Sequence, residues 1–245
     1  MFKWSKSDVK VLLLTLLAMI LITVVLWIFL HKKEEKYKKI PLIIITSILL
    51  ILEIIKQTKA IMDGYSNWTI PLHFCSLFLY FFPLAVFTKG KVQEFGKTMS
   101  FVCSLWLCVL FYFNPGGIIG STTTQNVFGS FGSFHTFFYH HLAILFLFVS
   151  VSLHFYNFTF KNLIYVVIGF AIYAIVGVSV AHLTNTNFCN LLESNIPFME
   201  SFRQHVGQVI YTIAMFLIGV AGGCVACLGY MGVDKLVTKN KKNKR

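Results

Sequence analysis

Residues 11–30 read VLLLTLLAMILITVVLWIFL, a run of twenty positions without a single charge. A membrane-spanning helix needs about 20 mainly apolar residues, because the hydrocarbon core is about 30 Å thick and a helix rises about 1.5 Å per residue. The run is longer than the apolar part of a signal peptide, and no small-residue cleavage site follows it. We interpret it as a retained first transmembrane helix.

Six further stretches share this character. The composition agrees with a membrane protein, since 57% of the 245 residues are hydrophobic and 12% are charged, against about 25% charged in soluble domains. We therefore predict an all-α polytopic membrane protein, with a single seven-transmembrane-helix domain at residues 1–231 and a basic cytoplasmic tail at residues 232–245. The predicted spans are residues 9–30, 40–57, 71–88, 98–115, 137–157, 161–183 and 207–231.

The basic residues predict an orientation. Cytoplasmic loops of membrane proteins are enriched in Lys and Arg. If the C-terminus is cytoplasmic, seven spans place the loops at residues 31–39, 88–97 and 158–161 on the same side. That side then holds 15 of the 21 Lys and Arg residues, although three N-terminal lysines fall outside. We predict an N-out, C-in protein of the cell membrane.

The net charge of +12 does not point to nucleic acid, because the basic residues lie in short loops and in the tail. The predicted partners are membrane lipids; the cysteine chemistry described below would add a phospholipid acyl donor and acceptor to them. The oligomeric state is left open. Five of the six cysteines lie in apolar runs, so no disulfide framework is expected.

The polar residues gather on the predicted outer side. Ionisable residues within spans are costly and usually face the interior of a helix bundle. We infer a shared pocket beneath the outer headgroups, near Glu53 and Cys75. The alternative is that each residue sits at the interface and is satisfied by headgroups or water. Six of the eight histidines fall on this side: His73, His135, His140, His141, His182 and His205.

One chemistry that fits such a pocket is nucleophilic catalysis by a thiol. A thiolate attacks a carbonyl carbon while a nearby imidazole takes or shares the thiol proton. Cys75 pairs with His140 or His141 in this reading, provided that their helices touch. Ester carbonyls of phospholipids lie at headgroup depth, so the implied substrate is a lipid acyl chain.

Two other classes of function remain open at this point. A metal site would draw on His135, His140 and His141, with Glu53 and His73 completing the shell. A non-enzymatic transporter or small-solute binding protein would use the same polar groups, with breaks at Pro and Gly in the helices. No pair of broken helices in matching halves of the chain supports the transporter.

Four segments resemble those of a known family. Residues 68–77, WTIPLHFCSL, resemble the W-x-x-(L)PLHxC segment of the YwaF-like integral membrane family, which includes the eukaryotic transmembrane protein 164, a lipid acyltransferase. Residues 114–115 (NP), 137–144 (FFYHHLAI) and 186–188 (TNF) resemble three further family elements. The resemblance covers about residues 40–230 and includes the seven-span layout.

The resemblance implies a cysteine nucleophile that carries the acyl group as a thioester, with a histidine partner. The nucleophile falls on Cys75 and the partner on His141, although the adjacent His140 leaves that choice ambiguous. We expect Glu53 to orient His73 or His141, or to pair with Lys56, and Asn187 to bind a headgroup or to cap a helix end. No metal and no cofactor are expected. The predicted substrate-binding residues are His73, Glu53 and Asn187.

Overall fold

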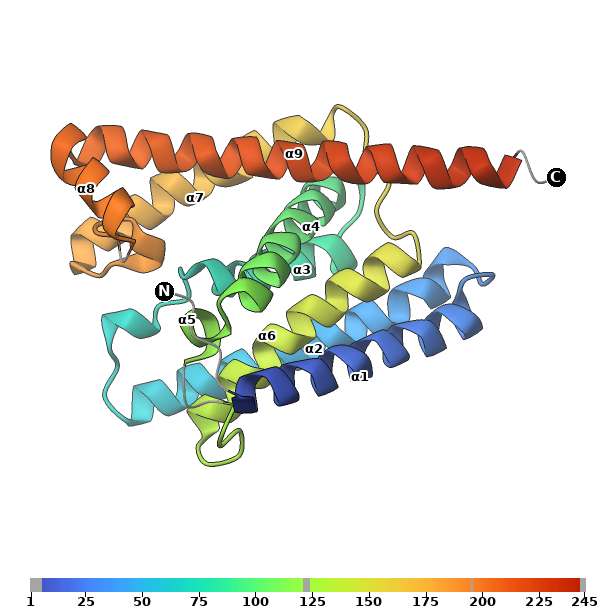
Figure 1. Ribbon diagram of the computed structural model, residues 1–245, viewed down its shortest axis with the longest axis horizontal. Helices are drawn as coiled ribbons and strands as arrows, with labels where there is room; N and C mark the ends of the chain where they lie inside the picture. The colour runs from blue at the N-terminus through green and yellow to red at the C-terminus, as the bar shows by residue number, and fades with distance from the viewer. Residues whose placement is uncertain (1–5, 121–123, 195, 243–245) are drawn as a thin grey trace. The chain divides into compact units, whose positions relative to one another are not determined.

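The computed structural model describes residues 6–120, 124–194 and 196–242, and every regular element within these ranges is a helix (Figure 1). Six of the described helices are long and apolar enough to cross a membrane. The all-α membrane class is therefore confirmed, whereas the count of seven spans and the N-out orientation stay predictions. The six are α1 (Lys6–Leu30), α2 (Glu35–Met62), α4 (Gly90–Phe113), α6 (Phe131–Ser152), α7 (Asn162–Thr184) and α9 (Gln208–Lys242).

Shorter helices connect these six. The α9 helix continues through most of the predicted basic tail, as far as Lys242. The shorter α-helices are α3 (Phe78–Phe87), α5 (Pro115–Ile119) and α8 (Pro197–Val206). Three single turns of 3₁₀ helix are η1 (Asn67–Thr69), η2 (Phe74–Leu77) and η3 (Phe188–Asn190).

The stretch predicted as the third span, residues 71–88, is helical only in part. The α3 helix has 10 residues and covers about 15 Å at the usual rise, half the thickness of a bilayer core. Tertiary contacts explain the late start, because they occupy backbone groups that a longer helix would use. The Leu72 carbonyl accepts a hydrogen bond from the Tyr173 hydroxyl at 2.9 Å, and the Phe74 N–H donates to the Cys189 sulfur.

The chain divides into two compact units, which we describe separately. Unit 1 consists of residues 1–65 and 78–157. Within it, α6 packs against α1, α2 and α4, and α3 packs along α4. Most of the described part of α6 is buried, which suits a central helix. That residues 1–231 form one domain stays a prediction.

The contact between α3 and α4 is unusually close at Gly96. A Cβ atom built on Gly96 would lie 2.5 Å from the Ala85 nitrogen and 2.6 Å from the Leu84 carbonyl carbon. Only a residue without a side chain allows this approach. Beside it, the rings of Phe82 and Phe146 stack with centroids 3.8 Å apart and join α3 to α6.

Unit 2 consists of residues 66–77 and 158–245. Its long helices α7 and α9 pack together, and α8 packs against α9. The segment at residues 66–77 packs against the loop that follows α7, through a small apolar cluster. The buried members of that cluster are Leu72, Ala181, Phe188 and Leu191.

Candidate functional site

The predicted site residues fall in both units. Glu53, His140 and His141 belong to unit 1, and His73, Cys75 and Asn187 belong to unit 2. Each set is therefore built up within its own unit.

In unit 1, the α2 helix presents a buried carboxylate to α6. Glu53 is buried, with only 8% of its side chain exposed. It accepts hydrogen bonds from Lys56 at 2.6 Å and from Gln57 at 2.7 Å on the same helix. Its other oxygen lies 3.4 Å from His135 Nε2 on α6. Glu53 thus pairs with Lys56, as one reading of the sequence expected, and the histidine beside it is His135.

His141 has partners at both ring nitrogens. Its Nδ1 lies 2.7 Å from the Phe137 carbonyl oxygen, one turn back on α6. Its Nε2 lies 3.0 Å from the Thr15 hydroxyl on α1. A neutral imidazole has one N–H, so Nδ1 donates to the carbonyl and the lone pair of Nε2 faces the Thr15 hydroxyl. The one proton of that hydroxyl is shared among His141 Nε2 and the Val11 and Leu12 carbonyls on α1, at 3.0 and 3.1 Å. The lone pair of His141 therefore has a donor within reach in unit 1.

The neighbouring His140 differs at one nitrogen. Its Nδ1 lies 2.6 Å from the Thr136 carbonyl oxygen, so this nitrogen also carries the proton. Its Nε2 is buried and has no hydrogen-bond partner among the described residues. An unprotonated nitrogen with an unoccupied lone pair is the form that a general base requires.

In unit 2, His73 braces the segment that carries Cys75. Its Nε2 donates to the Trp68 carbonyl at 3.1 Å, which ties the η2 end of the segment to the η1 end. The imidazole also packs on the Trp68 ring, with centroids 4.3 Å apart, and on the edge of Phe188 at 5.2 Å. These contacts hold the two ends of residues 66–77 together.

Cys75 lies in η2 and is half-buried. The amide of the preceding residue, Phe74, donates to the sulfur of Cys189, which places a second thiol beside the segment. Cys189 was not singled out by its sequence context. Its backbone is left-handed, at φ 51° and ψ 37°, a conformation that residue type rarely adopts. Composition and hydropathy carry no signal for such a conformation.

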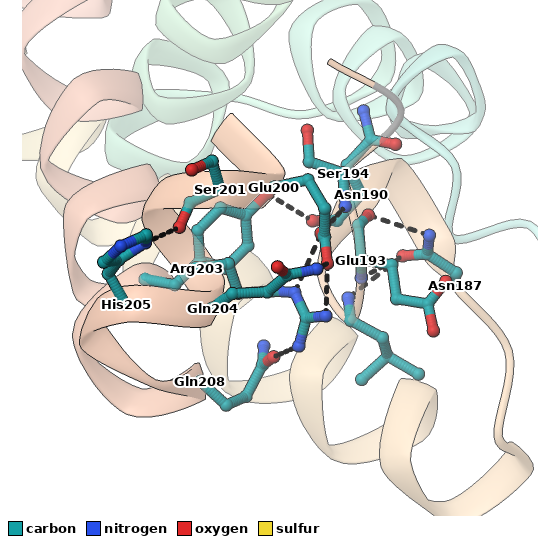
Figure 2. Close-up of polar contacts among 12 residues, drawn as sticks. Asn187, Asn190, Glu193, Ser194, Glu200, Ser201, Arg203, Gln204, His205 and Gln208 are labelled. Atoms are coloured by element: carbon teal, nitrogen blue, oxygen red, sulfur yellow. Dashed lines mark hydrogen bonds and ion pairs between the residues drawn. The ribbon is translucent and has the colours of Figure 1, made fainter. Parts of the chain in front are cut away.

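Asn187 organises the loop after η3 rather than capping a helix. Its side-chain oxygen accepts the amide protons of Leu192 at 3.0 Å and Glu193 at 3.3 Å. Its side-chain nitrogen donates to the Glu193 carbonyl at 2.9 Å. Figure 2 shows this loop beside α8. The side-chain oxygen and nitrogen of Asn187 are thus both hydrogen-bonded within the loop, and these bonds alone explain its position.

The Glu200 carboxylate, which pairs with Arg203 within α8, also binds the Ser194 amide and so holds the start of α8 to the same loop (Figure 2). Glu200 accepts two hydrogen bonds from the Arg203 guanidinium, at 2.5 and 2.9 Å, and one from the Ser194 amide at 2.9 Å. The guanidinium holds the pKa of Glu200 down at about 2. Gln208 at the start of α9 completes the link, because it accepts from Arg203 and donates to the Leu191 carbonyl.

A metal centre is not formed by the described part of the chain. Within it, no three His, Cys, Asp or Glu side chains lie close enough together to hold an ion. Both ring nitrogens of His141 and the Nδ1 of His140 are engaged with protein groups, which is consistent with that result.

The comparison with protein families settles the relationship of the chain. The sequence model of one family matches residues 1–221, most of the length. The chain belongs to the TMEM164 family. Membership of the TMEM164 family confirms the expected relation to transmembrane protein 164, whereas the YwaF name and the acyltransferase activity stay expectations. Together with the apolar helices, it makes the chain a multi-pass membrane protein. No curated protein and no solved structure matches the chain.

Proposed function

We propose that this TMEM164-family protein is a lipid acyltransferase of the cell membrane that works through an acyl-thioester on Cys75. The support is its family, the cysteine of the PLHxC segment, and a buried histidine with an unoccupied lone pair. The unpartnered Nε2 of buried His140 is the strongest support, because a buried nitrogen that accepts no hydrogen bond lowers the stability of the fold unless it has another role.

The reaction has two halves. In the first, a histidine takes the Cys75 proton, and the thiolate attacks the ester carbonyl carbon of a phospholipid. The carbon–oxygen bond to the glycerol breaks, and the imidazolium returns the proton to the departing alkoxide. In the second, the same imidazole takes the proton of an acceptor hydroxyl, which attacks the thioester. The carbon–sulfur bond breaks, and the thiolate recovers the proton.

The hydrogen bonding in unit 1 favours His140 as the base. The family resemblance alone assigns the partner to His141 by spacing. His141 Nε2, however, lies 3.0 Å from the Thr15 hydroxyl and would have to leave that contact, whereas His140 Nε2 has no hydrogen-bond partner among the described residues. Glu53 and His73 then act as positioning residues, through His135 and the Trp68 carbonyl respectively.

The direct test uses full-length protein in liposomes with a phospholipid labelled on its acyl chain and an unlabelled lysophospholipid. We expect label transfer by the wild type, and a hydroxylamine-sensitive label on the tryptic peptide that contains Cys75. Cys75→Ser should lose both, and Cys224→Ser, a half-buried cysteine on α9, should keep both. Undiminished transfer by Cys75→Ser would rule out the covalent mechanism. Saturable solute binding that survives the loss of Cys75 would instead favour the transporter.

A further inference from the structure

Two cysteines that are 114 positions apart in the chain meet in unit 2. The Cys189 sulfur accepts the amide proton of Phe74 at 2.5 Å and lies 3.9 Å from the Leu72 carbonyl oxygen. The amide nitrogen of one residue is at most about 5 Å from the next Cα atom. The Cys189 sulfur is therefore within roughly 7 Å of the Cys75 Cα.

The two backbones are held in place by contacts that do not involve either thiol. Tyr173 on α7 donates to the Leu72 carbonyl, and Asn67 donates to the Thr184 carbonyl at 3.4 Å. Leu72 and Phe188 pack in the same apolar cluster. A cysteine sulfur lies within about 3 Å of its own Cα, so the two Cα atoms are at most about 10 Å apart. A disulfide needs them within about 7 Å, and segments that are already docked cover the difference with little loss of chain entropy.

The conformation of Cys189 also makes it an unusual residue at this position. A left-handed backbone disfavours side chains other than Gly, Asn and Asp, by about 1–2 kcal/mol. The neighbouring left-handed residues at the end of α7 and in η3 are Asn185 and Asn190, which tolerate this conformation well. Only the middle one carries a thiol, and that thiol points at the segment containing Cys75.

We propose that Cys75 and Cys189 form a reversible disulfide, so that this face of unit 2 is a thiol modification site. No disulfide joins any of the described cysteines in the structure, which is the reduced form. The inference needs no acyl chemistry. If the proposed function also holds, the disulfide would occupy the nucleophile and switch acyl transfer off.

The oxidation proceeds by exchange with a small disulfide such as oxidised glutathione. The Cys75 thiolate attacks one glutathione sulfur, the bond between the two glutathione sulfurs breaks, and one glutathione thiolate leaves. The Cys189 thiolate then attacks the Cys75 sulfur and expels the second glutathione thiolate. The two thiol protons end on the two glutathiones, so two protein thiols are oxidised and one glutathione disulfide is reduced.

The second step should be slow at neutral pH. Burial raises the pKa of the Cys189 thiol to about 12, and the nearby Cys75 acts in the same direction. The titratable groups facing this thiol are Cys75 and the Tyr173 hydroxyl, which lowers the pKa in part. Only the thiolate form of Cys189 attacks the Cys75–glutathione bond. Below the pKa of Cys189, the rate of forming the Cys75–Cys189 disulfide should therefore rise about tenfold per pH unit.

The sequence makes the product easy to identify. Trypsin cuts after Lys59, Lys89, Lys161 and Arg203, which places each thiol on a peptide with no other cysteine. Full-length protein in detergent is treated with oxidised glutathione at pH 7 and pH 9, alkylated and digested. We expect a linked pair of peptides 60–89 and 162–203, formed about 100-fold faster at pH 9 when the starting material is the Cys75–glutathione adduct.

Two variants distinguish a specific Cys75–Cys189 disulfide from the oxidation of any accessible thiol. Cys189→Asn keeps a side chain suited to the left-handed backbone, and should stop at the glutathione adduct of Cys75 at both pH values. Cys224→Ser should give the same linked peptide as the wild type. The proposal is overturned if the oxidised wild type yields both peptides alkylated or only glutathionylated at pH 9, or if Cys75 links to a different cysteine. None of these readouts involves lipid turnover, so they stand apart from the test of acyl transfer.

Discussion

Replacing each of the adjacent histidines by asparagine separates a catalytic role from a structural one. The Nδ2 of asparagine occupies nearly the position of histidine Nδ1, so His140→Asn keeps the donor to the Thr136 carbonyl and His141→Asn keeps the donor to the Phe137 carbonyl. Both variants remove the same atoms from a buried helix. The difference between them is the loss of Nε2, which is unpartnered in one and bonded to Thr15 in the other.

His140→Asn should have the larger effect on the rate of acyl transfer, and His141→Asn the larger effect on stability. General base catalysis contributes about 10²–10⁴-fold, or roughly 3–5 kcal/mol of barrier, so His140→Asn should reduce acyl transfer by that factor. His141→Asn should change the rate less than tenfold. It also loses the contact with the Thr15 hydroxyl, worth at most about 1 kcal/mol, and should be the less stable of the two by up to that amount.

Acyl transfer is measured in liposomes, and stability by thermal unfolding of the same preparations in detergent. The comparison of the two variants in both assays decides between the roles. If His141→Asn abolishes transfer while His140→Asn retains it, the unoccupied lone pair of His140 is not the base, and the assignment from family spacing is restored. Equal losses of rate and of stability in both variants would show that the histidines only support the packing of α6.

Three further results are expected. Gly96→Ala should lower the free energy of unfolding by about 1–3 kcal/mol, because the new methyl group meets the α3 backbone at 2.5 Å, whereas Gly132→Ala on exposed α6 surface should leave it unchanged or raise it. Glu200→Gln should speed hydrogen exchange of the Ser194 amide at pH 7. In the wild type the carboxylate bond is present above the ordinary carboxyl pKa and is lost only as the pH falls toward about 2, so protection should persist at pH 4. Reporter fusions should place the N-terminus outside and the C-terminus in the cytoplasm, and the opposite pattern at either end would contradict the predicted orientation.

The long helices were predictable because the bilayer imposes a simple rule of length and hydropathy. The runs at residues 9–30, 161–183 and 207–231 meet that rule, and α1, α7 and α9 occupy them. The run at residues 71–88 is also apolar but is only partly helical. Hydropathy scores Leu72 and Phe74 the same in a helix or out of one, and it cannot register that Tyr173 and Cys189 take up their backbone groups.

The site was predictable in residue type but not in bonding. Glu53 and the histidines of α6 are ionisable residues in apolar stretches, so the sequence predicts that they avoid lipid. All of these side chains are buried within unit 1. Which nitrogen is occupied depends on the rotation of α6 against α1, which brings Thr15 to His141 and to no other histidine. Likewise, only the left-handed turn at η3 aims Cys189 at the segment of Cys75, and no local pattern encodes it.

The short reach of α3 limits how far the Cys75 thiol can lie from the membrane face that bears Lys89. Ten helical residues and the 3₁₀ turn as far back as Cys75 cover roughly 20 Å, which is about two thirds of the hydrocarbon thickness. Exposed amide groups are not tolerated in hydrocarbon, so residues 66–77 need protein or water around them at that depth. On the proposed function, a phospholipid ester would reach Cys75 only where the bilayer thins locally or where a hydrated funnel, on the order of 10 Å deep, opens from the opposite face. The proposal therefore predicts that acyl-chain length and bilayer thickness govern acyl transfer as strongly as headgroup chemistry.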